Sequence, residues 1–393
     1  MAKVSVAIIS NSQTLYRLHL HQRIARELPE IELWSLFTHE MSNSPWRIDS
    51  PADINPIFFG AGERSDGQSD WRNQRREWEK AGKILQWMRD HQVRAVVVLG
   101  YNDAGRLRII QSCRRDHIPC ILFGDSNIRS ERLRRWERAL KRIAVSTVVR
   151  SCAAVLHCGL LGAEYFKKYG ARPEAMFPFP YEPDYAVFEN APLATIQEVR
   201  KRYGLSSARR YFIYSGRLVP IKRVDLLIKA FASVAVNLQS WDLIIAGDGP
   251  LRSSLEASAP KELRLRVVWT GFVGDLATLA ALYKCADVLV LPSDVEPWGV
   301  VVTEAATGLA VVCTSAVGAA ADVVQDGVNG RIFSPGDAQA LAEVLLDVAS
   351  RDNVDRMKSE SPKILSAWRR RSDPVKGLRK ALQFVGALPG DPS

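Results

Sequence analysis

Short apolar runs recur along the whole chain, and they alternate with longer segments in which apolar residues return every three or four positions. Apolar runs of about four to eight residues are typical of buried parallel strands, whereas the longer period is typical of amphipathic helices. In the first half the predicted strands are Val4–Ile9, Ile31–Phe37, Val93–Leu99, Cys120–Phe123 and Ala153–His157. In the second half they are Tyr211–Tyr214, Trp241–Ala246, Val267–Trp269, Val288–Leu291, Ala310–Thr314 and Arg331–Phe333. This alternation predicts an α/β fold with parallel sheets and crossover helices.

Prolines interrupt this pattern near the middle of the chain, where Phe177–Pro183 holds three prolines in seven residues. Proline neither continues a helix nor fits a central strand, so this segment is predicted to connect two domains. A chain of 393 residues is also long for a single hydrophobic core. We therefore expect two Rossmann-like domains, residues 1–180 and 181–373, with a ligand in the cleft beyond the carboxyl ends of their strands.

Composition narrows the class of protein. The hydrophobic content is 47%, and no window holds the ~20 uninterrupted apolar residues of a membrane span. The first apolar run, Val4–Ile9, is predicted to be a strand and not the core of a signal peptide. The six cysteines show no metal-ligand spacing, so reduced, buried thiols are expected. Together these features predict a cytoplasmic protein.

The net charge of +10 is concentrated in the first half of the chain. Up to Pro180 there are 28 Lys and Arg against 19 Asp and Glu, and the remainder has 25 against 24. A uniformly basic protein would suggest a nucleic-acid partner. A one-sided distribution instead favours an acidic surface or substrate, with no nucleic acid.

The most basic predicted helix is Ile128–Arg150, with eight Arg and Lys and only two Glu. Its apolar residues fall at helical spacing: Leu133, Trp136, Leu140, Ile143 and Thr147. One interpretation is contact with anionic lipid or a polyanionic acceptor, with Trp136 at the interface and the protein peripheral at the inner membrane face. The other is a core-packed helix with a basic outer side. We favour the second interpretation, because helices that cover a sheet always need one apolar face.

Two cations follow the first strand of the second half. Gly216 allows the backbone to approach a ligand closely, Arg217 offers a planar fork for phosphate, and Lys222 offers a point charge at a predicted helix start. Both could simply be solvated. A cation at a helix N-terminus opposes the helix dipole, however, so the position favours a bound anion.

A second glycine-containing turn, Gly247–Asp248–Gly249–Pro250, follows the strand that ends at Ala246. It lacks the third glycine of a dinucleotide fingerprint, so an NAD site is weakly supported. Gly249 serves either a tight strand-to-helix turn or a ligand contact, and the sequence leaves both open.

Two carboxylates, Glu296 and Glu304, lie eight residues apart. On a helix this spacing corresponds to about 800°, which places the two side chains within ~80° of each other. If Glu296 precedes the helix, the backbone amides from Trp298 through Gly299 and Val300 to Val301 would face an anion or a sugar. Glu304 would hold the two hydroxyls of a ribose. The alternative is an acidic turn that merely suits the dipole, although the apolar neighbours of Glu304 predict that it has a polar partner. Cations for phosphate beside carboxylates for hydroxyls indicate a nucleotide sugar.

Three further polar residues are candidates for chemistry. Asp294 and Glu296 resemble an acidic metal-binding group, but no second acidic cluster or histidine pair accompanies them, so no metal is expected. In the first half, Asp125 follows the strand Cys120–Phe123 and either contacts an acceptor hydroxyl or caps the next helix. His157 ends a strand, and a structural role is favoured for it.

These motifs resemble those of the retaining glycosyltransferases of family 4, which have the GT-B architecture of two Rossmann-like domains facing each other across a cleft. The resemblance is strongest from about Arg210 to Leu341. It rests on Ser215–Gly216–Arg217 with Lys222, Ala246–Pro250, Thr270–Val273, Ala286–Ser293, Glu296–Gly299 with Glu304, and Asp326–Gly330.

The resemblance implies roles for these residues. Arg217 and Lys222 would hold the donor diphosphate, Glu296 would contact the donor sugar, and Glu304 the ribose. The loop around Phe272 and Val273 would lie by the base. No bound metal or cofactor is implied. The front domain would bind the acceptor and the rear domain the donor, and the C-terminal helix, Pro374–Gly386, would cross back onto the front domain.

The front domain departs from the family pattern. Ser10–Gln13 stands where many members have a Gly-Gly loop, and Gly124–Asp125–Ser126 where many have a histidine. The expected reaction is transfer of a hexose from a nucleoside-diphosphate sugar, UDP by family frequency, to a hydroxyl of a glycan or lipid-linked acceptor in surface or exopolysaccharide assembly. Glu296, Arg217, Lys222 and Asp125 would be the catalytic residues. The alternatives are a nucleotide-sugar epimerase and a non-catalytic protein that binds sugar nucleotides or polyanions.

Overall fold

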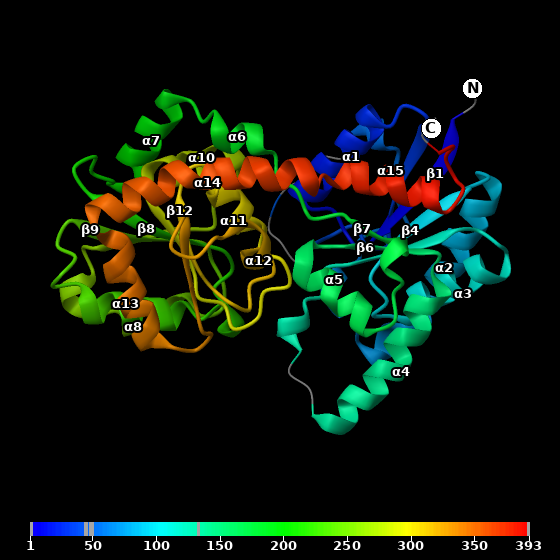
Figure 1. Ribbon diagram of the computed structural model, residues 1–393, viewed down its shortest axis with the longest axis horizontal. Helices are drawn as coiled ribbons and strands as arrows, with labels where there is room; N and C mark the ends of the chain where they lie inside the picture. Colours follow the sequence, from blue (N-terminus) through cyan, green and yellow to red (C-terminus); the bar gives the residue numbers. More distant parts are fainter. Residues whose placement is uncertain (1–2, 43–45, 47–50, 132–133, 391–393) are drawn as a thin grey trace. The chain divides into compact units, whose positions relative to one another are not determined.

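The computed structural model describes residues 3–42, 46, 51–131 and 134–390. The chain divides into two compact units (Figure 1). The front unit comprises residues 1–183 and 372–393, and the rear unit comprises residues 184–371. The sequence pattern placed the domain boundary three residues earlier, after residue 180.

The front unit is built on a sheet of seven parallel strands in the order β3-β2-β1-β4-β5-β6-β7. The strands are β1 (Val4–Ser10), β2 (Ile31–Phe37), β3 (Pro56–Phe58), β4 (Ala95–Leu99), β5 (Cys120–Gly124), β6 (Ala154–His157) and β7 (Met176–Pro178). The helices are α1 (Leu15–Glu27), α2 (Gln74–Asp90), α3 (Ala104–Arg115), α4 (Arg135–Ser151), α5 (Gly159–Lys168) and α15 (Pro374–Phe384). The five strands predicted for this half are all present, and the pattern missed the two short edge strands.

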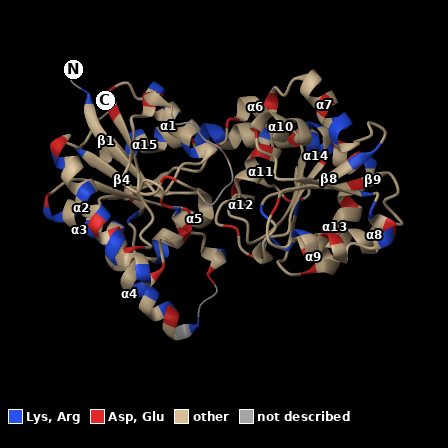
Figure 2. Ribbon diagram, turned by 180° about the vertical axis from the view of Figure 1, so that it is seen from behind, with Lys and Arg blue, Asp and Glu red and all other residues tan. Residues whose placement is uncertain are grey.

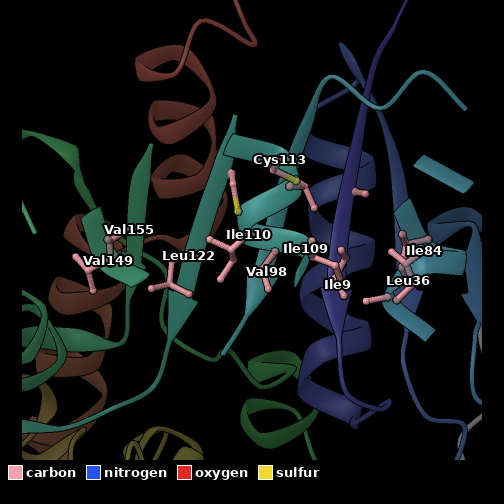
Figure 3. Packing of buried hydrophobic residues seen from close by; sticks show 14 of the residues in the cluster. Ile9, Leu36, Ile84, Val98, Ile109, Ile110, Cys113, Leu122, Val149 and Val155 are labelled. Carbon is pink, nitrogen blue, oxygen red and sulfur yellow. The ribbon is translucent and has the colours of Figure 1, made fainter. Parts of the chain in front are cut away.

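The core of the front unit lies between the sheet and its covering helices. Ile9 of β1, Val98 of β4 and Leu122 of β5 pack with Ile109 and Ile110 of α3 (Figure 3). Because helices cover both faces of a parallel sheet, its central strands are mainly apolar, which explains why the apolar runs located them.

The rear unit has six parallel strands in the order β10-β9-β8-β11-β12-β13. The strands are β8 (Arg210–Ser215), β9 (Trp241–Ala246), β10 (Val267–Gly271), β11 (Val288–Leu291), β12 (Ala310–Thr314) and β13 (Gly330–Phe333). The helices are α6 (Tyr185–Glu189), α7 (Leu193–Tyr203), α8 (Val224–Val234), α9 (Arg252–Ser258), α10 (Leu276–Cys285), α11 (Val300–Ala305), α12 (Ala320–Val323), α13 (Ala338–Ala349) and α14 (Arg351–Arg371). All six predicted strands are found. In both units the strand order reverses beside the first strand, as in a doubly wound sheet.

The proline-rich segment is only partly a connector. Its first residues form the end of β7, which pairs with β6 at the edge of the front sheet. An edge strand tolerates proline because one side of its backbone needs no hydrogen-bonding partner. The prediction that the whole segment connects the two domains was therefore wrong for these residues.

Helix α15 belongs to the front unit although the whole rear unit precedes it in sequence. It packs against β6, β7 and α1. The approach is close at Gly377, where an added Cβ would lie 1.7 Å from the carbonyl oxygen of Pro178. Arg379 forms an ion pair with Glu30 (2.7 Å).

The basic helix differs from its prediction. Ile128–Ser130 forms a short 3-10 turn, α4 begins at Arg135, and Leu133 lies outside the described residues. Trp136, Leu140 and Ile143 are 60%, 61% and 69% exposed, so the interpretation that they pack on the core was wrong. The C-terminal half of α4 is anchored through Val145 and Val149 instead. The N-terminal half extends beyond the rest of the front unit (Figure 1).

Among the described residues, no helix combines the length and the apolar character needed to cross a lipid bilayer.

Candidate functional site

The candidate site lies at the carboxyl edge of the rear sheet, where the strand order reverses between β8 and β11. Loops that diverge at such a point leave room for a ligand beyond the strand ends. Three segments meet there: residues 216–223 after β8, residues 247–251 after β9, and residues 292–299 after β11.

The loops after β8 and β9 are held together by their backbones. Leu218 donates its amide to the carbonyl of Asp248 (2.9 Å), and Leu251 donates to the carbonyl of Leu218 (3.1 Å). A Cβ added at Gly249 would lie 2.5 Å from the carbonyl oxygen of Leu218, and one at Gly247 only 1.9 Å from that of Gly216. A side chain at either glycine would clash with the neighbouring loop, so both glycines are required for the packing of the two loops. Of the two roles left open for Gly249, this observation supports the tight turn.

Lys222 and Glu296 form an ion pair across the gap between the β8 and β11 loops. Their side chains are 18% and 12% exposed, so the pair is largely shielded from water. Lys222 ends a three-residue 3-10 turn, and α8 begins two residues later at Val224, after Arg223 adopts a left-handed conformation (φ 53°). The expectation that Lys222 opens a helix was therefore wrong, because the left-handed backbone of Arg223 separates Lys222 from the first residue of α8.

Arg217 lies on the same edge and is exposed. Its carbonyl accepts a hydrogen bond from the hydroxyl of Tyr214 (2.8 Å). Burial raises the pKa of Tyr214, and the nearby charge of Glu296 raises it further, while Arg217 opposes the shift. The charges of Glu296 and Arg217 therefore both act on the Tyr214 hydroxyl, in opposite directions.

The loop that carries Glu296 is held by the segment after β12. Glu296 forms a parallel bridge with Val317, and its backbone carbonyl accepts a hydrogen bond from the amide of Gly318 (3.0 Å). The indole of Trp298 is buried and packs on Trp368, with a ring-centroid distance of 5.7 Å. Only the backbone of Trp298 is therefore available to a ligand. The loop ends at Gly299, whose φ of 89° suits glycine.

Helix α11 follows this loop and has only six residues. Its first turn contains Val300 and Val301, which are both half-buried at the start of the helix. Glu296 lies in the loop, so helical geometry does not govern its distance from Glu304.

Glu304 is buried on α11 and accepts a hydrogen bond from the hydroxyl of Tyr283 of α10 (3.2 Å). Burial raises the pKa of Glu304 to about 7, although the hydrogen bond from Tyr283 opposes the shift. Near neutral pH this carboxyl group therefore changes readily between its acid and its carboxylate. The predicted polar partner exists. No spacing in the sequence could identify Tyr283, because it lies on a different helix among apolar residues.

The loop after β10 contributes the last two predicted residues of the rear unit. Phe272 is exposed and Val273 is buried. This loop follows the edge strand of the sheet, two strands away from β8. An exposed aromatic ring at this position offers a flat surface to a base, whereas the side chain of Val273 supports the loop from within.

Asp294 is engaged by arginine. Arg223 contacts its carboxylate at 3.2 Å, and the amide of Asp294 donates to the carbonyl of Ile221 (2.9 Å). These contacts join the β8 and β11 loops. The Asp294 carboxylate is already paired with the Arg223 guanidinium, whereas a metal ligand would need a carboxylate that is open to the metal.

The front unit contains one group with metal-ligand geometry among the described residues: His39, Glu63 and Glu77. The ammonium of Lys80 lies 2.7 Å from Glu63 and 3.0 Å from Glu77, so an internal cation already occupies the space between the carboxylates. Burial raises the pKa of Glu77, but hydrogen bonds from His39 and Lys80 outweigh it and leave the pKa below its usual value. We interpret this group as a buried structural network.

Asp125 lies after β5 at the carboxyl edge of the front sheet and is half-buried. Its carboxylate accepts a hydrogen bond from the hydroxyl of Tyr181 (3.3 Å), a partner that the sequence did not reveal. Asn127, and not Asp125, caps the following turn by accepting from the amide of Arg129 (2.8 Å). The Nδ1 of His157 donates to the carbonyl of Gly159 (2.9 Å), and burial lowers the pKa of this imidazole, which fits the structural role favoured for it.

The comparisons with known proteins bear on the rear unit first. Residues 195–363 match the family described as glycosyl transferases group 1. For the segment that carries the motifs, this match confirms the resemblance to glycosyltransferases at the level of group 1. The chain is 35% identical over 161 residues to an uncharacterized glycosyltransferase of Methanocaldococcus jannaschii, which covers 39% of this chain and 40% of that protein. It is 28% identical over 190 residues to an alpha-D-kanosaminyltransferase of Streptomyces kanamyceticus, covering 48% and 46%. These matches span less than half the length of either relative.

The fold extends the likeness to both units. The structure resembles that of Anabaena HepE in complex with UDP and glucose, with a TM-score of 0.71 over 98% of this chain and 100% of that chain. The sequence identity is 19%, so this likeness concerns the fold. The predicted fold class, a GT-B arrangement of two Rossmann-like parallel-sheet domains, is confirmed.

Proposed function

We propose that this protein is a retaining glycosyltransferase of family 4 that transfers a hexose from a nucleoside-diphosphate sugar to an acceptor hydroxyl. The observation that carries the proposal is the shielded Lys222–Glu296 pair beside Arg217, at the switch point of a sheet within the segment that matches group 1 glycosyl transferases. A UDP-sugar is the favoured donor, because the structurally similar HepE was solved with UDP and glucose. The acceptor is a glycan or a lipid-linked hydroxyl in surface polysaccharide assembly.

The mechanism follows from where charge develops. The bond between the anomeric carbon and the diphosphate oxygen breaks, and negative charge accumulates on the leaving diphosphate. Arg217 and Lys222 stabilise that charge, since preorganised cations need no reorganisation when the bond breaks. Glu296 orients the sugar and, through its ion pair, holds the Lys222 ammonium in place.

The acceptor oxygen forms the new bond to the anomeric carbon on the face that the diphosphate leaves, so the configuration is retained. The acceptor's proton passes to an oxygen of the departing diphosphate, which balances the reaction without a covalent enzyme intermediate. Asp125 orients the acceptor hydroxyl, and the Tyr181 hydroxyl fixes the position of that carboxylate.

Glu304 provides a prediction about pH. A carboxylate accepts hydrogen bonds from both ribose hydroxyls, whereas in the acid form one oxygen carries the proton and donates a hydrogen bond. Because burial raises the pKa of Glu304 to about 7 before the donor binds, donor binding below pH 7 releases a proton. The affinity for UDP-glucose should rise about tenfold per pH unit up to pH 7 and then level off. Calorimetric titration from pH 5.5 to 8.5 measures this slope.

The matched variant is Glu304→Gln, which keeps the size of the side chain and removes its titration. It should bind UDP-glucose more weakly at pH 8 and with little pH dependence. Equal slopes for the wild-type protein and this variant would contradict the ribose role of Glu304.

The experiment that tests the proposed function is a turnover assay with the full chain, a panel of nucleoside-diphosphate sugars, and glycan and lipid-linked acceptors. We expect acceptor-dependent release of the nucleoside diphosphate, with the donor's anomeric configuration kept in the product by NMR. Conversion of the donor without any acceptor would instead identify an epimerase. Binding of a donor without turnover over the whole panel would identify a non-catalytic binding protein.

A further inference from the structure

Helix α1 begins with a buried cation. Arg17 lies in the first turn of this helix and is only 7% exposed. The first turn lies wholly within the described residues and contains no acid, and the side chain of the N-cap residue, Thr14, does not cap the helix. The free amides and the dipole of a helix favour a negative charge at this end, whereas Arg17 places a positive one there. A bound anion would satisfy both the amides and the cation.

The Arg17 guanidinium is held in place but not neutralised. Its Nη1 donates to the Oδ1 of Asn11 (3.1 Å) and to the carbonyl of Ser12. The loop itself is fixed, because the Asn11 carbonyl accepts a hydrogen bond from the amide of His39 (2.7 Å). Among the described residues, no carboxylate pairs with Arg17, and its Nε has no hydrogen-bond partner. The guanidinium therefore keeps donors for a ligand.

The other buried cations have counter-ions of their own. Three Lys or Arg residues are buried in the part of the chain that the structure describes: Arg17, Lys80 and Arg106. Lys80 contacts the carboxylate of Glu77 (3.0 Å), and Arg106 pairs with Asp103. A buried charge without a counter-ion is costly. Of these three described cations only Arg17 lacks one, which indicates that a ligand supplies it.

Arg17 lies beside the residue proposed to orient the acceptor. The ring of Tyr16 packs on that of Tyr181, with centroids 4.8 Å apart, and the Tyr181 hydroxyl donates to Asp125 (3.3 Å). Burial raises the pKa of Tyr181, the charge of Asp125 raises it further, and the charge of Arg17 opposes the shift. Asp125 and Arg17 thus both act on one hydroxyl, and both follow the carboxyl ends of strands of the front sheet.

We propose that Arg17 and the N-terminus of α1 bind a phosphate group of the acceptor, while Asp125 orients the acceptor's hydroxyl. A guanidinium offers a planar fork to phosphate, and helix amides offer further donors, so the phosphate oxygens can be shared between them. The front unit also favours an anionic ligand, because Lys and Arg recur along α2, α3 and α4 (Figure 2), and a basic surface attracts anions. A neutral acceptor would leave Arg17 without a counter-ion. The identity of the ligand as the acceptor rests on the proposed function, whereas the anion site does not.

Calorimetric titration of the full chain with inorganic phosphate tests the site directly. The titration is carried out at constant ionic strength and with saturating UDP, so that the donor site is occupied. We expect Arg17→Gln to lower the phosphate affinity about 10- to 100-fold, the effect of losing hydrogen bonds to a charged group. The matched control is Arg26→Gln, which removes an exposed arginine from the same helix and should bind phosphate like the wild-type protein.

Folding is checked by thermal unfolding of the same samples. In phosphate-free buffer Arg17→Gln should not lower the melting temperature, because the charge that it removes has no counter-ion. Phosphate should raise the melting temperature of the wild-type protein and not that of the variant. If the glutamine variant does not fold, Arg17→Lys decides, since it keeps the charge and loses the planar fork, and it should bind phosphate more weakly than the wild-type protein.

Two results overturn the proposal. One is equal phosphate affinity in the wild-type protein and the folded Arg17 variants. The other is a loss of UDP affinity in Arg17→Gln as large as that in Lys222→Ala, which would assign Arg17 to the donor diphosphate.

The turnover assay tests the identity of the ligand. With acceptors that differ only in one phosphate group, Arg17→Gln should raise the KM for the phosphorylated form about 10- to 100-fold and leave kcat and the KM for the donor unchanged. Equal KM values of the wild-type protein for both forms would overturn the assignment to the acceptor. Absence of turnover with every acceptor would refute the proposed function, whereas the phosphate titration decides the anion site without any turnover.

Discussion

Replacing Lys222 by alanine is expected to lower the rate of sugar transfer by a factor of about 10²–10³ while leaving the fold intact. The Lys222 ammonium is the shielded cation of the site, and its pairing with Glu296 fixes its position before the donor binds. An alanine removes the charge that would stabilise the leaving diphosphate and leaves the Glu296 carboxylate to repel it. The kcat with a UDP-sugar donor measures the loss.

A matched control is Lys229→Ala, which removes an exposed lysine from α8 a few residues further along the chain. It should leave both the rate and the melting temperature unchanged. Glu296→Ala should also be strongly impaired, and the double variant should lose less than the product of the two single losses, because the residues act as a pair. Normal transfer by both single variants would refute the assignment of the site.

Replacing Lys80 by alanine is expected to lower the free energy of unfolding of the front unit by about 3–5 kcal/mol. Lys80 is buried with Glu77, and its ammonium also contacts Glu63. Its removal leaves the buried Glu77 carboxylate without its cation, and burial prevents water from replacing the ammonium there, whereas Glu63 keeps its contact with Arg76 at 3.5 Å. Amide hydrogen exchange of β1 and β2 reports this unit separately, and protection there should fall about 10²- to 10⁴-fold.

Lys83→Ala provides the comparison, because Lys83 is exposed on the same helix, α2. Its effect should stay within about 0.5 kcal/mol. A loss of less than about 1 kcal/mol for Lys80→Ala would show that the network contributes little to stability.

The sequence predicted the fold well wherever a strand is buried on both faces. β1, β4 and β8 consist mainly of apolar residues, and in a chain of alternating elements such runs indicate buried parallel strands. Short edge strands gave no comparable signal. β3 has three residues and follows a loop rich in Ser, Pro and Asp, and β7 ends in a proline.

Periodicity also found α4 but not its orientation. A helical period shows that apolar residues share a face, and it does not show whether that face meets the core. Val145 and Val149 form a second, shorter apolar face, and this face packs on the core. Only the three-dimensional packing distinguishes the two faces.

At the site, the sequence identified the residues, and the structure supplied their partners. Lys222 and Glu296 are 74 residues apart, so no local spacing predicts their ion pair. The hydroxyls of Tyr283 and Tyr181, which position Glu304 and Asp125, also come from distant segments. For Trp298, the sequence identified the motif but not the surroundings of the side chain, since the indole is buried against Trp368.

The return of α15 to the front unit has a consequence for synthesis on the ribosome. The residues that cover β6 and β7 are translated only after residues 184–371 have all been added. At roughly 5–20 residues per second, the unit that starts first therefore waits about 10–40 s for its last helix. At the end of that interval the rear unit is complete in sequence, whereas the front unit still exposes the apolar surface of β6 and β7 that α15 will cover.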